Sequence, residues 1–196
     1  MNKQPSRKEV THERIVSTAA RAIRRAGFQG LGVADIMQEA GLTHGGFYAH
    51  FASRNALLVE ALEQAGTEGA ARIAKGVARG QGSGTGALRA VVEGYLSERH
   101  LASTEDGCPV AALVSEMPRQ APEVRQAAAQ RVRGLIGTIQ RTLPPDAAAE
   151  IAAVIAGQLV GALQLARALG NNAEGKALLA ATRRALLAQY DHSSAV

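Results

Sequence analysis

Tryptophan is absent from this 196-residue chain, and three Phe and three Tyr supply all of its aromatic side chains. The single cysteine, Cys108, excludes an intrachain disulfide and fits a reducing cytoplasm. The five histidines show no paired His/Cys spacing, so we expect no metal site and no cofactor. No uninterrupted apolar run approaches the ~20 residues that span a bilayer, and the polar start lacks the apolar core of a signal peptide. We therefore expect a cytoplasmic protein without a membrane partner.

The composition is rich in Ala and Leu and shows little β-branched alternation, which predicts an all-α fold. Caps, glycines and prolines divide the chain into about nine helices. Residues 1–10 are expected to be a mobile arm, Thr11 and Ser53 to cap helices, and the Gly-rich residues 80–86 to be a flexible connector. The expected helices cover residues 11–26, two short stretches within 33–51, and then 53–78, 85–102, 109–117, 122–143, 146–169 and 173–190.

The stretch from Val33 to Phe51 has the pattern of a helix-turn-helix. A short amphipathic helix is followed by Gly41, which suits the left-handed backbone of a helix C-terminus, and Thr43 is a plausible N-cap for the second helix. Two glycines inside so short a helix are costly, at roughly 1 kcal/mol each relative to Ala. They are explained if the backbone must approach another surface closely, with phosphate at the helix N-terminus. The alternative is a loose loop between two core helices.

Positive charge is concentrated next to this motif. The first 25 residues hold seven basic side chains against Glu9 and Glu13, while the whole chain has a formal charge of +5. Such a segment would be attracted to a phosphate backbone, although a solvated helix face is the usual fate of a charge run. The basic residues are Lys3, Arg7, Lys8, Arg14, Arg21, Arg24 and Arg25.

The first sixty residues resemble the N-terminal DNA-binding domain of the TetR family of transcriptional regulators. The resemblance is carried by AGF at 26–28, DIMQEAGLTHGGFYAHF at 35–51 and FASRNALL at 51–58. It spans three helices and both turns, whereas the rest of the chain is similar only in length and helical character. It implies a three-helix DNA-binding domain over 1–52 and a helical ligand-binding and dimerisation domain over 53–196.

The resemblance also implies which residues meet double-stranded DNA. Tyr48 would contact the sugar-phosphate backbone, and Phe47 and Phe51 would belong to the core. At position 33 the family often has a Thr or Ser that caps the helix, and at 44 it often has a Lys. His44 is charged only when protonated, so we expect DNA binding to weaken as pH rises. The residues implied in DNA binding are Val33, Thr43, His44, Gly45, Gly46, Tyr48, His50 and Arg54.

A ligand pocket and a dimer interface are implied for the second domain. The last two helices would pair with their copies in a homodimer, and Gly157 and Gly161 would permit close helix–helix approach. Cys108 is either a small buried hydrophobe or a sensor of oxidants and electrophiles. His100 and Cys108 lack a third group and an oxyanion donor, so no enzyme is expected. The expected pocket residues are Tyr95, His100, Cys108, Met117 and Gln158.

These features together predict a regulator, most simply a repressor that binds a palindromic operator as a homodimer and responds to a small-molecule effector. Three alternatives remain open at this point. The protein could sense redox state through Cys108, carry an enzyme behind a DNA-binding head, or be a helical interaction protein without a DNA role.

Overall fold

The computed structural model describes residues 5–30, 32–82, 84–145 and 147–191. Within those ranges every regular element is a helix, which confirms the predicted all-α fold. The elements are α1 Arg7–Ala26, α2 Val33–Glu39, the 3-10 helix η1 His44–Ala49, α3 Arg54–Gly82, α4 Ala87–Tyr95, α5 Glu98–Ala102, α6 Pro109–Leu113, the 3-10 helix η2 Met117–Arg119, α7 Pro122–Gln140, α8 Ala149–Leu169 and α9 Ala173–Tyr190.

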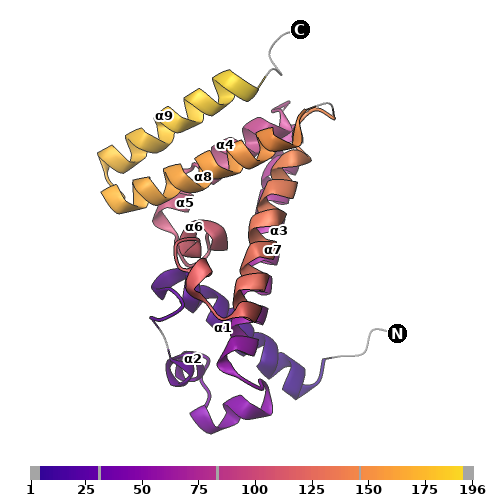
Figure 1. Ribbon diagram of the computed structural model, residues 1–196, viewed down its shortest axis with the longest axis vertical. Coiled ribbons are helices and arrows are strands. Elements are labelled where there is room, and N and C mark those ends of the chain that lie inside the picture. The colour runs from indigo at the N-terminus through magenta and orange to yellow at the C-terminus, as the bar shows by residue number, and fades with distance from the viewer. Residues whose placement is uncertain (1–4, 31, 83, 146, 192–196) are drawn as a thin grey trace.

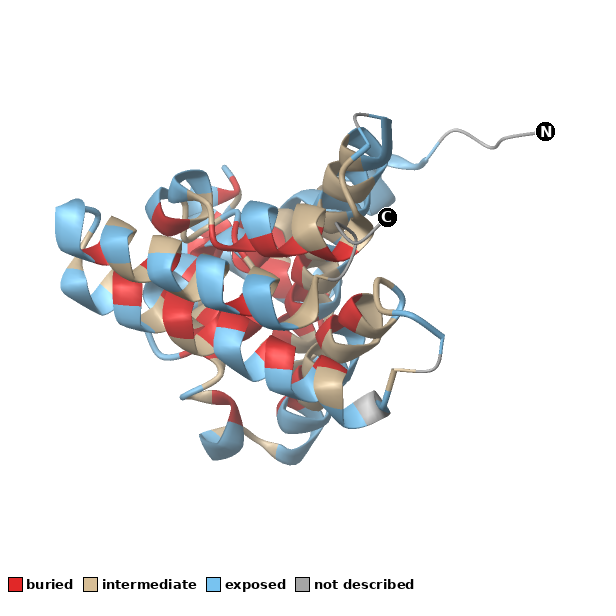
Figure 2. Ribbon diagram, turned by 90° about the horizontal axis from the view of Figure 1, so that it is seen from above, coloured by how far each residue is buried: buried red, intermediate tan, exposed pale blue. Residues whose placement is uncertain are grey.

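The helices form a head, a shaft and a cross-layer (Figure 1). The head contains α1, α2 and η1, and the neighbouring helices α3 and α7 run from it to the opposite end of the molecule. There α8 and α9 pack against each other and lie across the shaft. Figure 2 shows buried residues where the helices face one another and exposed residues on their outward faces.

Two apolar cores hold these parts together. The first joins Phe28 and Phe47 of the head, and Leu58 of α3, to Leu113 and Val124 of α6 and α7. The second joins α4, α8 and α9 with the remaining part of α7. The head is therefore packed onto α6 and α7, because one apolar cluster contains residues of all three.

The first helix begins earlier than the sequence pattern predicts. Ser6, not Thr11, is the N-cap of α1: its hydroxyl accepts from the Glu9 backbone N–H at 3.3 Å, and the Glu9 carboxylate accepts from the Ser6 N–H at 2.6 Å. This reciprocal capping box satisfies two N–H groups that the helix end leaves open. The expected arm is thereby shortened, and residues 1–4 lie outside the described residues.

The long helix α3 continues to Gly82, so the Gly-rich segment is helical at its start rather than a connector throughout. The helix expected over 85–102 is broken instead, because the Ser97 hydroxyl accepts from the His100 N–H at 3.2 Å and starts α5. The helix expected over 109–117 stops at Leu113, α7 ends at Gln140, and α8 begins at Ala149. The predicted Ser53 cap and α9 are confirmed.

Helix α8 differs from an ordinary surface helix. Residues 150–169 are long and apolar enough to cross a membrane by length and composition alone, although Glu150, Gln158, Gln164 and Arg167 interrupt them. Fewer than half of these residues are buried here. One side, with Ile155, Leu159 and Leu163, belongs to the second core, and the other leaves apolar side chains exposed.

Candidate DNA-binding head and central cavity

The turn of the head has the geometry that the sequence predicts. Gly41 has φ +70°, and the Leu42 N–H donates to the Met37 carbonyl at 2.9 Å. This left-handed position lets the chain leave α2 without a Cβ clash. The second helix is a 3-10 helix, not an α-helix, and Thr43 occupies its N-cap position without a side-chain cap bond. Short 3-10 segments are common where α-helical propensity is poor, as it is at Gly45-Gly46.

The outward face of η1 is open to solvent. Thr43, His44 and Gly45 are exposed, and the Tyr48 side chain is 74% exposed, whereas Phe47 is only 1% exposed. Phe47 and Phe51 stack in the core, as predicted, with ring centroids 5.5 Å apart. A Cβ added at Gly45 would meet nothing within 4 Å, and one at Gly46 would meet only the Met37 methyl at 3.7 Å. Packing inside the molecule therefore gives no reason for either glycine.

Val33 and Arg54 have internal roles in this structure. Gly32 is the N-cap of α2, and its N–H donates to the Asp35 carboxylate at 2.9 Å. Val33 is therefore the first helical residue, and its half-buried side chain packs on the core. The Arg54 guanidinium donates to the Phe28 carbonyl. Contact of either residue with DNA stays a prediction.

His50 lies at the junction of η1 with α1. Its Nδ1 is buried without a hydrogen-bond partner, and its ring centroid lies 6.0 Å from that of His12. Loss of hydration, followed by the nearby His12 and Lys8, lowers the pKa of His50. The His12 Nε2 lies 2.6 Å from the Glu60 carboxylate, and its ring stacks on Phe51. His50 is therefore part of a joint between helices, with only partial exposure for a phosphate contact.

The basic segment is less available to DNA than its sequence suggests. Arg24 is 2% exposed and forms a 2.8 Å ion pair with Glu68 of α3. Arg25 pairs with Glu39 and Glu105 at 2.7 and 3.2 Å. Lys3 lies outside the described residues. The exposed basic side chains that remain on the described part of this segment are Arg7, Lys8, Arg14 and Arg21.

A cavity of about 930 Å³, here called the central cavity, lies between α3, α4, the residues 99–110 and α7. Tyr95, His100 and Cys108 line it, as expected from the sequence. Met117 and Gln158 do not: Met117 is buried in the first core beneath the head, and Gln158 is exposed on α8. Met117 belongs to η2, beyond the end of α6, and packs into the first core instead, and Gln158 lies on the exposed side of α8.

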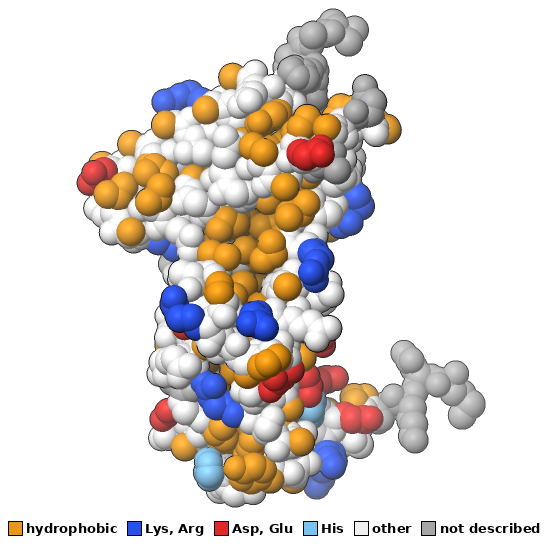
Figure 3. Space-filling view, viewed as in Figure 1, with side chains coloured by type: hydrophobic (Ala, Val, Ile, Leu, Met, Phe, Trp, Pro, Cys, Tyr) orange, Lys and Arg blue, Asp and Glu red, His pale blue; other side chains and the backbone are white. Residues whose placement is uncertain are grey.

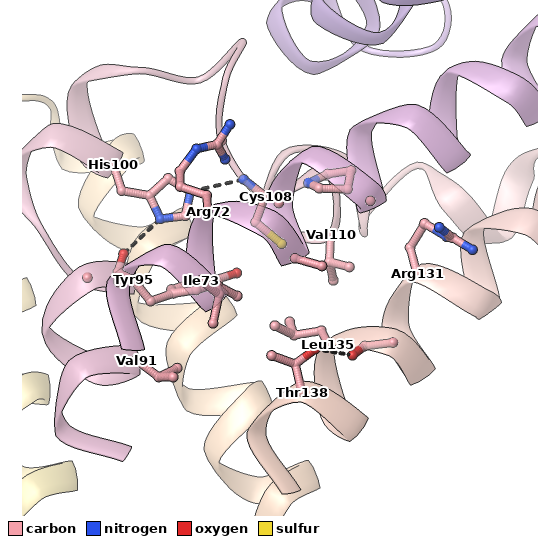
Figure 4. Close-up of a pocket in the computed structure, with 18 of the residues that line it drawn as sticks. Arg72, Ile73, Val91, Tyr95, His100, Cys108, Val110, Arg131, Leu135 and Thr138 are labelled. Atoms are coloured by element: carbon pink, nitrogen blue, oxygen red, sulfur yellow. Dashed lines mark hydrogen bonds between the residues drawn. The ribbon is translucent and has the colours of Figure 1, made fainter. Parts of the chain in front are cut away.

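His100 is held by two opposed hydrogen bonds at the wall of the central cavity (Figure 4). Its Nδ1 donates to the Tyr95 carbonyl at 2.8 Å, and its Nε2 accepts from the Cys108 backbone N–H at 3.0 Å. Because one ring nitrogen donates and the other accepts, this pattern requires the neutral imidazole. Burial, with Arg167 and Arg72 nearby, lowers the pKa of His100 to about 4 despite the bond to the Tyr95 carbonyl. The imidazole therefore faces the Cys108 backbone rather than acting as a base toward its thiol.

Tyr95 closes the buried end of the cavity. Its side chain is 4% exposed, its ring meets the His100 ring edge-to-face at 4.8 Å, and its hydroxyl has no hydrogen-bond partner. Burial and the adjacent Cys108 raise the pKa of Tyr95 well above its ordinary value. Figure 4 shows the tyrosine side chain, from α4, directed toward the Cys108 thiol.

The arginines that line the central cavity were not identified from the sequence. They are spread over α3, α5 and α7, and no local motif joins them. The only available signal was that α7 is rich in arginine, which reads equally well as a solvated helix face. The six lining arginines are Arg72, Arg79, Arg99, Arg131, Arg133 and Arg141.

Family models match both halves of the chain. The model for bacterial regulatory proteins of the tetR family matches residues 15–61, and that for the tetracyclin repressor-like C-terminal domain matches residues 84–182. An uncharacterized HTH-type transcriptional regulator of Mycobacterium tuberculosis (strain ATCC 25618 / H37Rv) is 35% identical over 166 residues, covering 79% of this chain and 83% of that one. The HTH-type transcriptional repressor NemR of Escherichia coli (strain K12) is 25% identical over 133 residues, covering 68% and 67%.

Solved structures share the whole fold. A TetR transcriptional regulator from Chloroflexus aurantiacus J-10-FL superposes with a TM-score of 0.75 at 25% identity, covering 93% of this chain and 96% of that one. The reduced form of E. coli NemR superposes with a TM-score of 0.71 at 22% identity, covering 89% and 96%. The second likeness shows the fold alone.

Proposed function

This chain belongs to the TetR family of bacterial regulatory proteins, and we propose that it represses transcription as a cytoplasmic homodimer whose operator affinity is lowered by an effector in the central cavity. The chain is a DNA-binding transcriptional regulator of the helix-turn-helix type. The operator, the effector, the dimer and the direction of regulation are the parts that we propose.

The observation that carries the proposal is the exposed face of η1. An aromatic ring that is 74% exposed, at Tyr48, stands beside a phenylalanine that is fully packed. Thr43, His44 and the unobstructed backbone at Gly45 share the surface with Tyr48. A protein gains nothing in stability from a solvent-exposed ring, and a major groove offers both thymine methyls and phosphates to such a surface. The exposed Arg7, Lys8, Arg14 and Arg21 supply charge for the phosphate backbone.

The proposed dimer uses the outer face of the cross-layer. Val154, Leu165 and Leu169 of α8 are 49%, 60% and 38% exposed, which is unusual for large aliphatic side chains on one helix. A Cβ at Gly157 or Gly161 would meet nothing within 4 Å, so a partner helix can approach that face closely. Figure 3 shows the surface over α8 and α9 as mainly apolar or uncharged, with charges at its margins. A two-fold pair would present two η1 surfaces to half-sites about 34–36 Å apart.

The effector would act through the walls of the central cavity. A ligand that binds one arrangement of these walls better than the other shifts the equilibrium between head positions by its difference in affinity. Such coupling is typically about 1–3 kcal/mol, and DNA must weaken effector binding by the same factor.

The test is binding to duplexes from the DNA that flanks the protein's own gene, measured by fluorescence anisotropy at two salt concentrations, with the mass from analytical ultracentrifugation. Saturable binding by a dimer, falling steeply with salt, supports the proposal. A monomer that binds none of the duplexes contradicts it.

A second candidate function rests on the position of the thiol. Cys108 is half-buried and lines the central cavity, so an oxidant or electrophile that enters the cavity could reach it. In that case, treatment with such a reagent releases DNA from the wild type but not from Cys108→Ser. Equal release from both proteins removes this candidate and leaves the repressor proposal standing.

A further inference from the structure

The charge around the central cavity is strongly one-sided. Six arginines line it, and among the described residues the only lining carboxylate is Asp106. That carboxylate already accepts a 3.1 Å hydrogen bond from the Ser103 hydroxyl. A cavity with this balance carries a positive potential, which its low-dielectric walls strengthen.

Several of these arginines have no anionic partner. Across the described ranges no ion pair joins Arg72, Arg99, Arg131 or Arg133 to a carboxylate, whereas Arg24 outside the cavity is paired. The Nε of Arg131 is buried without a hydrogen-bond partner. Arg72, Arg99 and Arg133 are exposed to solvent, whereas Arg131 is half-buried. A partly buried guanidinium without a matching acceptor is a favourable site for an external anion.

The chain also holds Arg131 in place across the cavity. Its side chain lies against Gly66 of α3, where an added Cβ would come within 2.6 Å of the Arg131 Cδ. Arg72 approaches from α3, close enough to the His100 ring to help lower its pKa. Figure 4 shows Arg72 and Arg131 on opposite sides of the side chains around Cys108 and Val110. Packing therefore holds Arg131 in place, and the exposed Arg72 supplies positive charge on the other side of the cavity.

Between these arginines the walls are apolar. Ile73, Val91, Val110 and Leu135 line the cavity and belong to, or pack on, the second core. The Tyr95 hydroxyl lies at their buried end, beside Cys108. A volume of about 930 Å³ is ample for a small organic molecule. An inorganic anion alone would leave the apolar walls without contacts.

We propose that the central cavity binds an amphipathic organic anion, with its carboxylate or phosphate on Arg131, further positive charge from Arg72 across the cavity, and its hydrocarbon body on the apolar wall. This assignment rests on the proposed function, because it names the chemical class of the effector. The carboxylate and the phosphate ester satisfy the same guanidinium geometry, and the test separates them.

The test compares ligands of one chain length by isothermal titration calorimetry in the absence of DNA. Each ligand is kept below the concentration at which it forms micelles. Decanoate and decyl phosphate are the anionic probes, decanol is the neutral match and decylamine the cationic one. We expect an anion to bind at least tenfold more tightly than decanol or decylamine. Whether decanoate or decyl phosphate binds more tightly identifies the head group. Binding of decanol as tight as that of both anions, or of no probe, overturns the proposal.

Variants locate the site. Arg72→Gln/Arg131→Gln should weaken binding of the preferred anion at least tenfold and leave decanol binding within twofold. Arg125→Gln is the matched control, since Arg125 is an exposed arginine of α7 that does not line the cavity. An unchanged affinity in the double variant overturns the proposal, provided that its unfolding transition matches that of the wild type. If the folded double variant loses binding of decanol as well as of the anion, the assignment of the head group to these arginines is also overturned.

A parallel measurement of operator affinity distinguishes this inference from the proposed function. If the anion binds through the arginines but leaves operator affinity unchanged, the site stands and the effector role fails. If the protein binds its operator and no anion binds, the regulator stands and the ligand class is wrong.

Discussion

Arg24, in the last turn of α1, donates a 3.3 Å hydrogen bond to the backbone carbonyl of Gly107, a residue of the cavity wall. The same guanidinium pairs with Glu68 of α3 at 2.8 Å. A Cβ at Gly107 would come within 2.9 Å of the His100 Nε2, so this wall is tightly packed. A buried cation of the head thus contacts the wall of the central cavity directly.

Replacing Arg24 should lower the free energy of unfolding by more than the loss of a solvent-exposed ion pair does. In Arg24→Leu the partly exposed Glu68 loses its partner, and we expect a loss of about 2–3 kcal/mol in the free energy of unfolding, measured with urea. The double variant Arg24→Leu/Glu68→Leu should recover part of this loss, because the partly exposed Glu68 carboxylate is then no longer left without its partner. Arg25→Leu is the control, and its solvent-exposed pairs should cost less than about 1 kcal/mol. Equal losses in Arg24→Leu and Arg25→Leu would show that burial of the Arg24 pair adds nothing.

Tyr48→Ala should reduce operator affinity at least tenfold while the protein stays a folded dimer, since the ring is 74% exposed. Anisotropy titrations and a melting curve measure the two effects. Tyr48→Phe separates the hydroxyl from the ring. Phe47→Ala is the contrast: it empties a core site and should cost about 3–5 kcal/mol of stability. Normal DNA binding by Tyr48→Ala would show that η1 is not the recognition surface.

Gly45→Ala tests why the glycine is there. A methyl at this position meets open space, so the free energy of unfolding should be unchanged or higher by up to about 1 kcal/mol. Operator affinity should nevertheless fall, because the methyl lies between the backbone and the DNA. Gly41→Ala, at φ +70°, should instead lose about 1 kcal/mol of stability. If Gly45→Ala keeps full operator affinity, close approach of this backbone to DNA is refuted.

Leu165→Arg should convert the dimer to a monomer, because it places a charge on the exposed apolar face of α8. Sedimentation velocity over a range of concentrations gives the mass. Val10→Arg makes the same chemical change at a 50% exposed residue on α1 and should leave the mass unaltered. If the Leu165→Arg protein is still a dimer, the interface lies on another surface of the molecule.

The stability of the fold should fall as pH decreases from about 6.5 toward 4. The pKa of His100 is lowered to about 4 in the folded chain, so the unfolded chain binds more protons across this range and is favoured by acid. Between pH 7.5 and 5.0 this contributes a loss of about 2 kcal/mol, which His100→Gln should not show. Urea unfolding of both proteins at the two pH values isolates the difference from other titrating groups. Parallel losses would mean that His100 is not the group responsible.

The sequence alone was sufficient for the local features of the head. Gly27 and Gly41 adopt the positive φ values that their positions require, and Phe47 and Phe51 are buried because each lies at helical spacing with other core residues. The end of α9 and the Ser53 cap are equally local, since each depends on residues within one turn. Helix ends were wrong where two caps competed, as at Ser6 and Thr11, and also where an internal cap divided a helix, as at Ser97.

Only the tertiary structure decided which charges are available. Arg24, Arg25 and Arg72 look alike in the sequence, yet the first is buried against Glu68, the second is paired at the surface, and the third faces a cavity. The carboxylate partners of Arg24 and Arg25 lie 14 to 80 residues away along the chain, so no pattern of spacing identifies them. The charge and the fold class follow from residue type and local periodicity. Whether each guanidinium is buried, paired or facing the cavity depends instead on which helices pack against it.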